Sequence, residues 1–275
     1  MPNFIVGARL HDYGKGTPEE LFGQVSADGF AAVQLAYKKC VPSVKSYADV
    51  TDALVAETVA AEKAHHIQVA VLGTYVELAI NDESRLRNVA DFKSQLAVCK
   101  ALGAGCIGTE TTAMSKQPAG TTRAQAQELL CRSLAEILPA AEALGVTVGI
   151  EPVTYHSMNS AAATRHILDT MRSPNLKVIF DMSNLVSAEN VDAQDRIWYD
   201  MGALLGDQIV AVHFKGQAFA PDGNLLHTSL EESRTDYAGA FAMLRQLPQP
   251  ALPVLREEAV PARAASDIAF MKGFF

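Results

Sequence analysis

The chain alternates between short runs of apolar residues and longer stretches in which apolar and polar residues recur with helical spacing. The apolar runs lie at residues 4–8, 31–35, 67–72, 106–109, 146–151, 177–181, 209–213 and 253–257. Runs of this length, rich in β-branched residues, are typical of strands. The stretches between them are rich in Ala, Leu, Glu, Lys and Arg and predict helices, among them 46–65, 83–102, 123–144, 160–172, 192–205 and 236–247. A strand followed by a helix is therefore the repeating unit.

Residues at the expected helix ends support these boundaries. Thr17, Pro18 and Glu20 can supply the N-cap, the first-turn proline and the capping-box acid of the first helix. A glycine follows four predicted helices, where a left-handed residue often ends a helix. These glycines are Gly29, Gly103, Gly145 and Gly206.

Eight strand-helix units predict a closed parallel barrel. Such a (β/α)8 TIM barrel needs about 250 residues, and this chain has 275, whereas a doubly wound sheet usually has fewer strands. No linker rich in Ser, Gly or Pro divides the chain. We therefore predict one α/β domain spanning residues 1–275.

Composition excludes some classes of function. The chain has 31 acidic and 23 basic residues and a net charge of −8, which disfavours nucleic acid as a partner. No basic leader precedes an apolar core, and no apolar run approaches the ~18 residues that span a bilayer, so we expect a cytoplasmic protein without membrane contact. The four cysteines lack metal-site spacing and are expected to be reduced.

Four consecutive predicted strands end on residues that can bind metal: Glu151, Asp181, His213, and Glu257 or Glu258. Each has an ordinary structural explanation by itself, such as a helix cap, a core histidine or a solvated acid. The carboxyl ends of barrel strands share one face, however, so these side chains are expected to converge there. Their joint occurrence favours a functional site.

Three carboxylates and one imidazole form a mostly oxygen donor set. That set suits one divalent ion, with Mn²⁺, Mg²⁺ and Co²⁺ favoured and Zn²⁺ a further candidate. Without a cation the carboxylates would repel one another. Long predicted loops at residues 73–83, 111–122 and 214–235 would form the walls of a pocket on this face.

Four segments carry a resemblance to a known family. IEPVTYHSMNS (150–160), FDMSN (180–184), VHFKG (212–216) and LREE (255–258) resemble the xylose isomerase-like TIM barrels. That family includes sugar isomerases and epimerases, inosose dehydratases and a class of AP endonucleases. The resemblance implies one divalent metal, Mn²⁺ first, held by Glu151, Asp181, His213 and Glu257. Glu257 is preferred because VLRE matches the usual apolar run, and Glu258 remains the alternative.

The resemblance also implies an activity. We expect an isomerase or epimerase of a sugar or sugar derivative that works by proton transfer through an enediolate, with Glu151 and Glu257 as base and acid. Lys215, His156, His11 and Asn184 are candidate substrate contacts. A small carbohydrate is the expected partner, and relatives commonly form homo-oligomers, either dimers or tetramers.

Departures from the family pattern leave alternatives open. Asn184 stands where many relatives have a histidine, and Gly216 stands where an acid is common, which weakens a ketose 3-epimerase assignment. A metal-dependent lyase or dehydratase of an oxidised or cyclic sugar, of the inosose or 3-oxo-glycoside type, is the main alternative. A non-catalytic metal-dependent sugar-binding protein comes third. The AP endonuclease assignment is disfavoured because its zinc cluster needs further histidines, which His227 alone does not replace.

Overall fold

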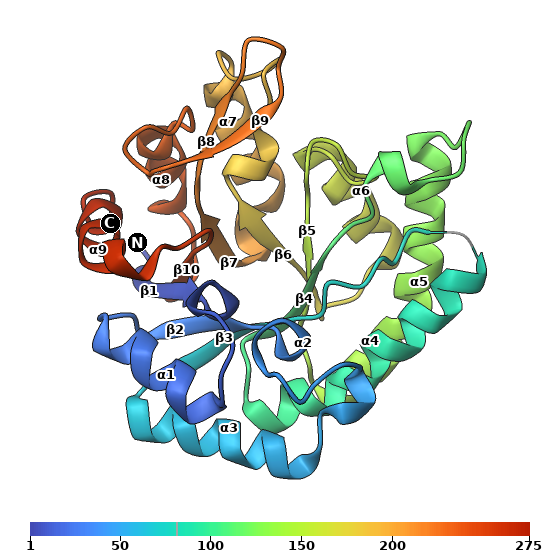
Figure 1. Ribbon diagram of the computed structural model, residues 1–275. Coiled ribbons are helices and arrows are strands. Elements are labelled where there is room, and N and C mark those ends of the chain that lie inside the picture. Colours follow the sequence, from blue (N-terminus) through green and yellow to red (C-terminus); the bar gives the residue numbers. More distant parts are fainter. Residues whose placement is uncertain (81) are drawn as a thin grey trace.

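Eight parallel strands form a closed barrel in the computed structural model, which describes residues 1–80 and 82–275 (Figure 1). Each strand pairs with the next along the chain, and the last pairs with the first. The (β/α)8 barrel predicted from the sequence is confirmed. The barrel strands are β1 (Asn3–Arg9), β2 (Ala32–Leu35), β3 (Gln68–Gly73), β4 (Cys106–Glu110), β5 (Val148–Glu151), β6 (Leu176–Asp181), β7 (Ile209–Phe214) and β10 (Ala251–Arg256).

Helices surround the barrel (Figure 1). The α-helices are α1 (Pro18–Ala27), α2 (Tyr37–Cys40), α3 (Asp52–His65), α4 (Asp82–Leu102), α5 (Arg123–Leu144), α6 (Ala161–Met171), α7 (Gln194–Leu205), α8 (Tyr237–Leu244) and α9 (Ala264–Lys272). Short 3₁₀ turns lie at Leu10–Tyr13, Tyr47–Asp49, Met114–Lys116, Ser183–Leu185, Gly206–Gln208 and Pro261–Arg263. The predicted capping box of α1 is present, with the Glu20 backbone N–H donating to Thr17 Oγ1 at 3.3 Å.

Two helix predictions need correction. The predicted helix at 46–65 begins at Asp52, where the Thr51 side chain accepts from the backbone of Leu54 and caps α3. Gly29, Gly103 and Gly145 have positive φ as predicted, but Gly206 has φ −53° and is not left-handed. The reason for glycine there is packing, because a Cβ atom would lie 2.8 Å from Leu247 Cδ2.

The predicted loop 214–235 contains a two-stranded antiparallel hairpin, β8 (Gly216–Phe219) and β9 (Leu225–Thr228). Figure 1 shows it projecting beside α7. Gly216 allows the two strands to approach, because a Cβ atom there would lie 2.4 Å from the carbonyl oxygen of Thr228. In the predicted loop 73–83, residue 81 lies outside the described residues.

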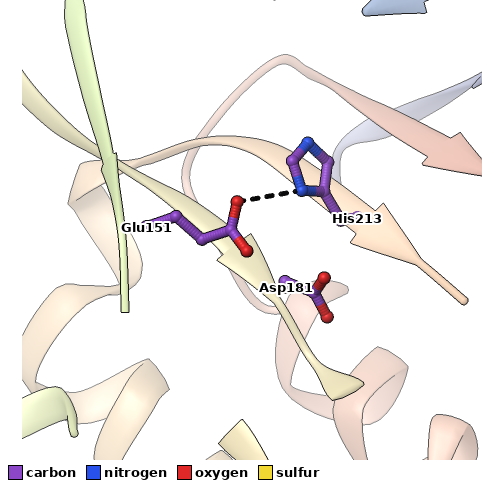
Figure 2. Close-up of side chains that lie close together, drawn as sticks. All are labelled: Glu151, Asp181 and His213. Atoms are coloured by element: carbon purple, nitrogen blue, oxygen red, sulfur yellow. Dashed lines mark ion pairs between the residues drawn. The ribbon is translucent and has the colours of Figure 1, made fainter. Parts of the chain in front are cut away.

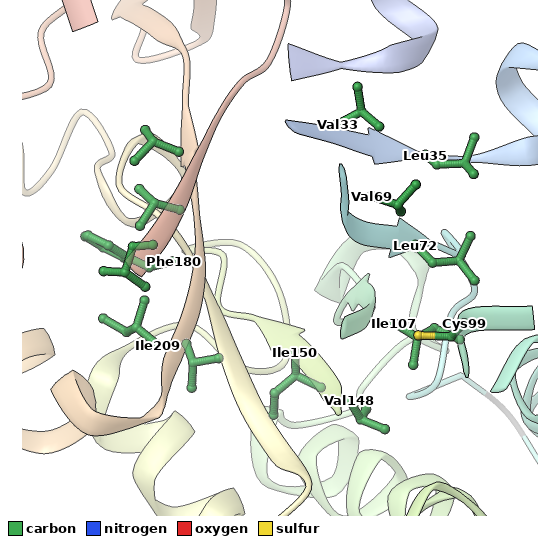
Figure 3. Close-up of a cluster of buried hydrophobic side chains, with 14 of the residues drawn as sticks. Val33, Leu35, Val69, Leu72, Cys99, Ile107, Val148, Ile150, Phe180 and Ile209 are labelled. Carbon is green, nitrogen blue, oxygen red and sulfur yellow. The ribbon is translucent and has the colours of Figure 1, made fainter. Parts of the chain in front are cut away.

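Strand side chains divide into two buried layers. On β6, Val178 and Phe180 pack outward in the large cluster between strands and helices, part of which Figure 3 shows, while Ile179 points into the barrel. Gly108 and Gly149 leave room for Ile179, because a Cβ atom at either would lie within 2.8 Å of its side chain. The inner cluster consists of Ala32, Ala70, Val71, Cys106, Ile179, Ala211 and Leu255.

An aromatic cluster holds the two ends of the chain together. Phe4 of β1 lies 5.2 Å from the ring of Phe275 at the C-terminus, measured between centroids. Phe241 of α8 is fully buried and contacts both rings, at 5.4 Å and 5.5 Å. The ring of Phe241 therefore links the first strand, α8 and the C-terminal segment.

Replacing Phe241 tests how much this cluster contributes to the stability of the fold. Phe241→Ala removes a fully buried ring and is expected to lower the free energy of unfolding by about 3–5 kcal/mol in a denaturant titration. Leu86→Ala, at a side chain on α4 that is 55% exposed, is the control and should change it by about 0.5 kcal/mol or less. Equal effects of the two variants would contradict this account.

Candidate metal centre

Alternation along the strands decides which rim side chains point into the barrel. On β5, Val148 and Ile150 pack against the helices, so Glu151 points inward. The same alternation turns Asp181 inward on β6 and His213 inward on β7, where Asp181 and His213 are register partners. Three adjacent strands thus deliver these three groups to one place.

Alternation also separates the two glutamates after β10. Leu255 lies in the inner cluster, so Glu257, two residues later, lies on the same side and is 5% exposed. Arg256 points outward, where its guanidinium Nε lies 2.8 Å from Asp267 Oδ2 of α9. Glu258 pairs with Arg9 at 2.9 Å, and its side chain is 40% exposed. The structure thus places Glu257 toward the centre and Glu258 at its edge.

The convergent groups lie within contact distance of one another. His213 Nδ1 lies 3.1 Å from Glu151 Oε2 and 3.6 Å from Glu257 Oε1. Figure 2 shows Glu151, Asp181 and His213 converging from adjacent strands, with the Glu151 carboxylate beside the imidazole. One ligand atom from each of these three residues lies within 4.8 Å of the others.

Two further residues hold the carboxylates in place. Asn184, in the turn after β6, donates from its side chain to Glu151 Oε1 at 2.6 Å and from its backbone to Asp181 Oδ1 at 2.9 Å. Lys215 Nζ lies 2.8 Å from Asp181 Oδ2 and 3.6 Å from Glu257 Oε2. Lys215 is therefore buried between two acids and is not a solvated loop lysine.

Mutual electrostatics change the ionisation of the site. Burial alone would lower the pKa of His213, but the carboxylates of Glu257 and Glu151 outweigh it and raise the pKa to about 9. Burial alone would raise the pKa of Glu257, but the charges of His213, Lys215 and Arg9 lower it to about 2. Burial raises the pKa of Asp181 above its ordinary value.

The donor set fits a divalent cation. His213 is only 2% exposed, and its Nε2 is buried without a hydrogen-bond partner in the described part of the chain, while Nδ1 faces the carboxylates of Glu151 and Glu257. Buried polar atoms of this kind are rare unless a ligand satisfies them. Together with two carboxylates, one imidazole nitrogen can hold a metal ion.

The two other predicted histidines lie on the same rim but outside the convergent group. His11, in the turn after β1, lies edge-on to Tyr75 at 5.7 Å between ring centroids, and burial lowers its pKa to about 4. His156, in the segment after β5, has Nε2 3.8 Å from Glu110 Oε2, and burial lowers its pKa to about 4 as well. Both are therefore neutral near pH 7.

Three further residues at the mouth of the barrel were not expected from the sequence. Glu110 is the register partner of Glu151, and burial raises its pKa to about 7. The strand predicted from the sequence stopped at Thr109, one residue short of Glu110, so this acid was not recognised.

Arg9 and Tyr75 also lie at this rim. Arg9 ends β1, and its Nη1 lies 3.7 Å from Glu257 Oε1. Tyr75 has a φ of 53° and accepts a hydrogen bond from Gln34 at 2.8 Å.

Comparison with known proteins identifies the family of this chain. A family model described as the xylose isomerase-like TIM barrel matches residues 22–273. The chain belongs to this family. A comparison with curated protein sequences finds no match.

Solved structures of xylose isomerase-like barrels are similar over nearly their whole length. The apo 3-keto-D-glucoside 4-epimerase YcjR from E. coli is 17% identical with a TM-score of 0.74, covering 98% of this chain and 100% of that one. A D-psicose 3-epimerase determined in the presence of D-fructose is 16% identical with a TM-score of 0.72, covering 98% and 97%. The IOLI protein with a bound zinc atom is 15% identical with a TM-score of 0.76, covering 98% and 96%. At these identities the likeness establishes the fold.

No helix among residues 1–80 and 82–275 has the length and apolar character needed to cross a membrane.

The pKa of His213 predicts competition between protons and metal. A metal-binding imidazole must be neutral, and with a pKa of about 9 the metal-free protein holds a proton there at pH 7. Mn²⁺ affinity, measured by calorimetry, should therefore rise by about tenfold per pH unit from pH 7 to 9 and then level off. His227→Gln, on the exposed hairpin, should keep this slope. An affinity that does not change with pH would contradict the assignment.

We also expect the hydrogen bond from Asn184 to Glu151 to strengthen metal binding. Asn184→Ala removes the hydrogen bond to Glu151 and should weaken Mn²⁺ binding about 10- to 100-fold in the same titration. Asn224→Ala, at the exposed hairpin turn, should bind as the unchanged protein does. Unaltered affinity in Asn184→Ala would show that this hydrogen bond does not orient a ligand.

Proposed function

We propose that this protein is a divalent-metal-dependent isomerase or epimerase of a sugar or sugar derivative. One observation carries the proposal: two carboxylates, Glu151 and Glu257, face the same buried imidazole from strands that are separated by β6 and β7. A substrate bound above the imidazole would meet one carboxylate on each side. That arrangement suits removal of a proton by one group and its return by the other.

Glu151, Asp181, His213 and Glu257 would hold the ion. The preponderance of oxygen donors favours Mn²⁺, with Mg²⁺, Co²⁺ and Zn²⁺ as alternatives. When bound, the ion supplies Lewis-acid stabilisation of the negative charge that develops on the substrate oxygens. The similar IOLI structure contains a zinc atom, which supports a bound metal ion here.

The chain's own residues can perform the proton transfer. Glu257 is ionised at neutral pH and can accept a proton from the carbon beside a carbonyl. Glu151, oriented by Asn184, can deliver from the other side a proton that it has taken from solvent, and Glu257 then releases its own proton to solvent. Lys215 keeps its positive charge because Asp181 and Glu257 outweigh its burial and raise its pKa, so it can stabilise an oxygen that gains negative charge.

Elimination is the alternative chemistry. The buried ammonium of Lys215, beside Asp181 and Glu257, could also donate to a departing hydroxyl. A dehydratase acting on an inosose or a 3-oxo-glycoside would use the same groups for the first proton transfer. The similar 3-keto-D-glucoside 4-epimerase and D-psicose 3-epimerase favour rearrangement of a sugar over elimination.

Product analysis in D₂O separates these reactions. Mn²⁺-loaded protein is incubated with ketohexoses, 3-oxo-glucosides and inososes, and the products are followed by NMR. Epimerisation or isomerisation should place deuterium on the carbon that receives the proton, whereas dehydration should yield a product lacking one hydroxyl. Protein treated with EDTA is the control. Sugar binding without either product would contradict an enzymatic function.

Glu257 and Glu258 offer a matched pair of variants. Glu257→Gln should lower kcat by about 10²- to 10⁴-fold, because the amide cannot accept a proton. Glu258→Gln changes an adjacent, 40% exposed side chain and should alter kcat by less than about threefold. A larger loss of kcat in Glu258→Gln than in Glu257→Gln would assign the proton-accepting role to Glu258.

A further inference from the structure

A second space on the catalytic face is larger than the one at the metal centre. The space bounded by Glu151, His213 and Glu257 has a volume of about 10 Å³, room for little more than an ion or a water molecule. Beside it lies a cavity of about 440 Å³, and the two share Tyr75, Thr109 and Glu110 as a common wall. The larger cavity is therefore where a bulky part of a substrate can lie when its reacting carbon is at the metal centre.

The walls of this cavity are formed by the segments that follow β3, β4 and β5. They are tied to one another by backbone hydrogen bonds from Met114 to Tyr155 at 3.0 Å and from Ser157 to Thr112 at 3.0 Å. Thr112 Oγ1 accepts from the backbone of Ala79 at 3.0 Å. The cavity is thus preformed, as ligand sites usually are.

Buried polar atoms line this cavity without partners. Thr111 Oγ1 and His156 Nδ1 have no hydrogen-bond partner among the described residues, although the two residues are only 2% and 5% exposed. Glu77, which also lines the cavity, likewise has a buried oxygen, Oε2, without a hydrogen-bond partner among the described residues. A buried donor or acceptor left without a hydrogen bond costs about 1–3 kcal/mol, and a side-chain rotation that turned these groups into the cavity would let a ligand rich in hydroxyl groups satisfy them.

An aromatic face completes the cavity. Tyr155 is 53% exposed, and its ring is held edge-on by His156 at 4.7 Å and 83°. An aromatic ring offers a rigid apolar surface with a polar tip. A sugar ring, with C–H groups on one side and hydroxyl groups around it, matches this combination of flat surface and unpartnered polar atoms.

The charges of the lining residues disfavour an anionic ligand. Lys116 is the only ammonium group among them, and it is paired with Glu77. Burial keeps His156 neutral at pH 7. A phosphate group would therefore meet the acids Glu77 and Glu110, and the one ammonium group among the lining residues is already paired with an acid.

We propose that this cavity is a subsite for a second, uncharged sugar ring, so that the substrate is a neutral disaccharide or glycoside and not a phosphorylated monosaccharide. The inference rests on the proposed function, since it assumes that a sugar reacts at the metal centre. It adds the substrate class and assigns Thr111 and Tyr155 as specificity-determining residues.

Binding of ketoses that share one fructose unit tests the subsite. Mn²⁺-loaded protein is titrated calorimetrically with D-fructose, D-fructose 6-phosphate and the glucosyl-fructoses turanose, maltulose, leucrose and isomaltulose. At least one glucosyl-fructose should bind about tenfold more tightly than fructose, and the phosphate should bind no more tightly than fructose. Tighter binding of the phosphate, or no preference for any disaccharide, would overturn the proposal.

Two variants locate the preference in the cavity. Thr111→Val, nearly isosteric, and Tyr155→Ala should each lower the affinity for the preferred disaccharide about fivefold or more and leave fructose within about twofold. Tyr199→Ala, at a 67% exposed aromatic on α7, is the control and should change neither affinity. Because Tyr155 is half exposed, its variant remains informative if Thr111→Val fails to fold. Equal losses for fructose and disaccharide would place the binding elsewhere.

Deuterium exchange distinguishes failure of the subsite from failure of the proposed function. Exchange into fructose without any disaccharide preference would overturn the subsite and leave the isomerase or epimerase intact. Disaccharide preference that depends on Thr111 and Tyr155, with no exchange into any of the sugars, would support the subsite and overturn the proposed function.

Discussion

Three carboxylates are buried together at the mouth of the barrel, and the rest of the site depends on how their repulsion is balanced. Glu151, Asp181 and Glu257 are each no more than 5% exposed. Like charges removed from water are unfavourable unless positive groups and hydrogen-bond donors accompany them. Here Lys215 pairs with Asp181 at 2.8 Å, and Arg9 lies 3.7 Å from Glu257. A bound divalent cation would complete this balance.

The barrel interior positions these charges. Small residues and two glycines leave the inside of the sheet just wide enough for Ile179, which forms the floor below the carboxylates. Dense packing of this kind allows little movement of the strand ends. Side chains alternate between the two faces of a strand, so Ile179 and Asp181, two residues apart on β6, both point into the barrel. The same strand therefore supplies both the hydrophobic floor and one of the carboxylates above it.

Backbone strain lies beside the centre and not within it. Tyr75 and Glu258 adopt left-handed φ values of 53° and 55°, which are unusual for residues other than glycine. Surrounding contacts hold both, since Gln34 donates to the Tyr75 hydroxyl at 2.8 Å and Arg9 pairs with Glu258 at 2.9 Å. Tyr75 also forms part of the wall between the metal centre and the larger cavity.

The sequence by itself determined the strand-helix repeat, the closed barrel and the strand ends that carry Glu151, Asp181 and His213. These follow from local rules, namely hydrophobic period, capping residues and the common direction of parallel strands. Glu110 was not predicted, because the apolar run stops at Thr109, one residue before β4 ends, and the hairpin β8–β9 was predicted as a loop.

Tertiary structure alone decided what each rim residue contacts. Glu257 and Glu258 are adjacent and chemically identical, and only the inward position of Leu255 distinguishes them. In the sequence Lys215 looks like an ordinary loop lysine. Only the fold shows that Asp181, on β6, and Glu257, after β10, lie beside its ammonium group. The physical reason is the same in each case: burial, ion pairing and cavity shape depend on distances between residues far apart in the chain, and barrel closure and register set those distances.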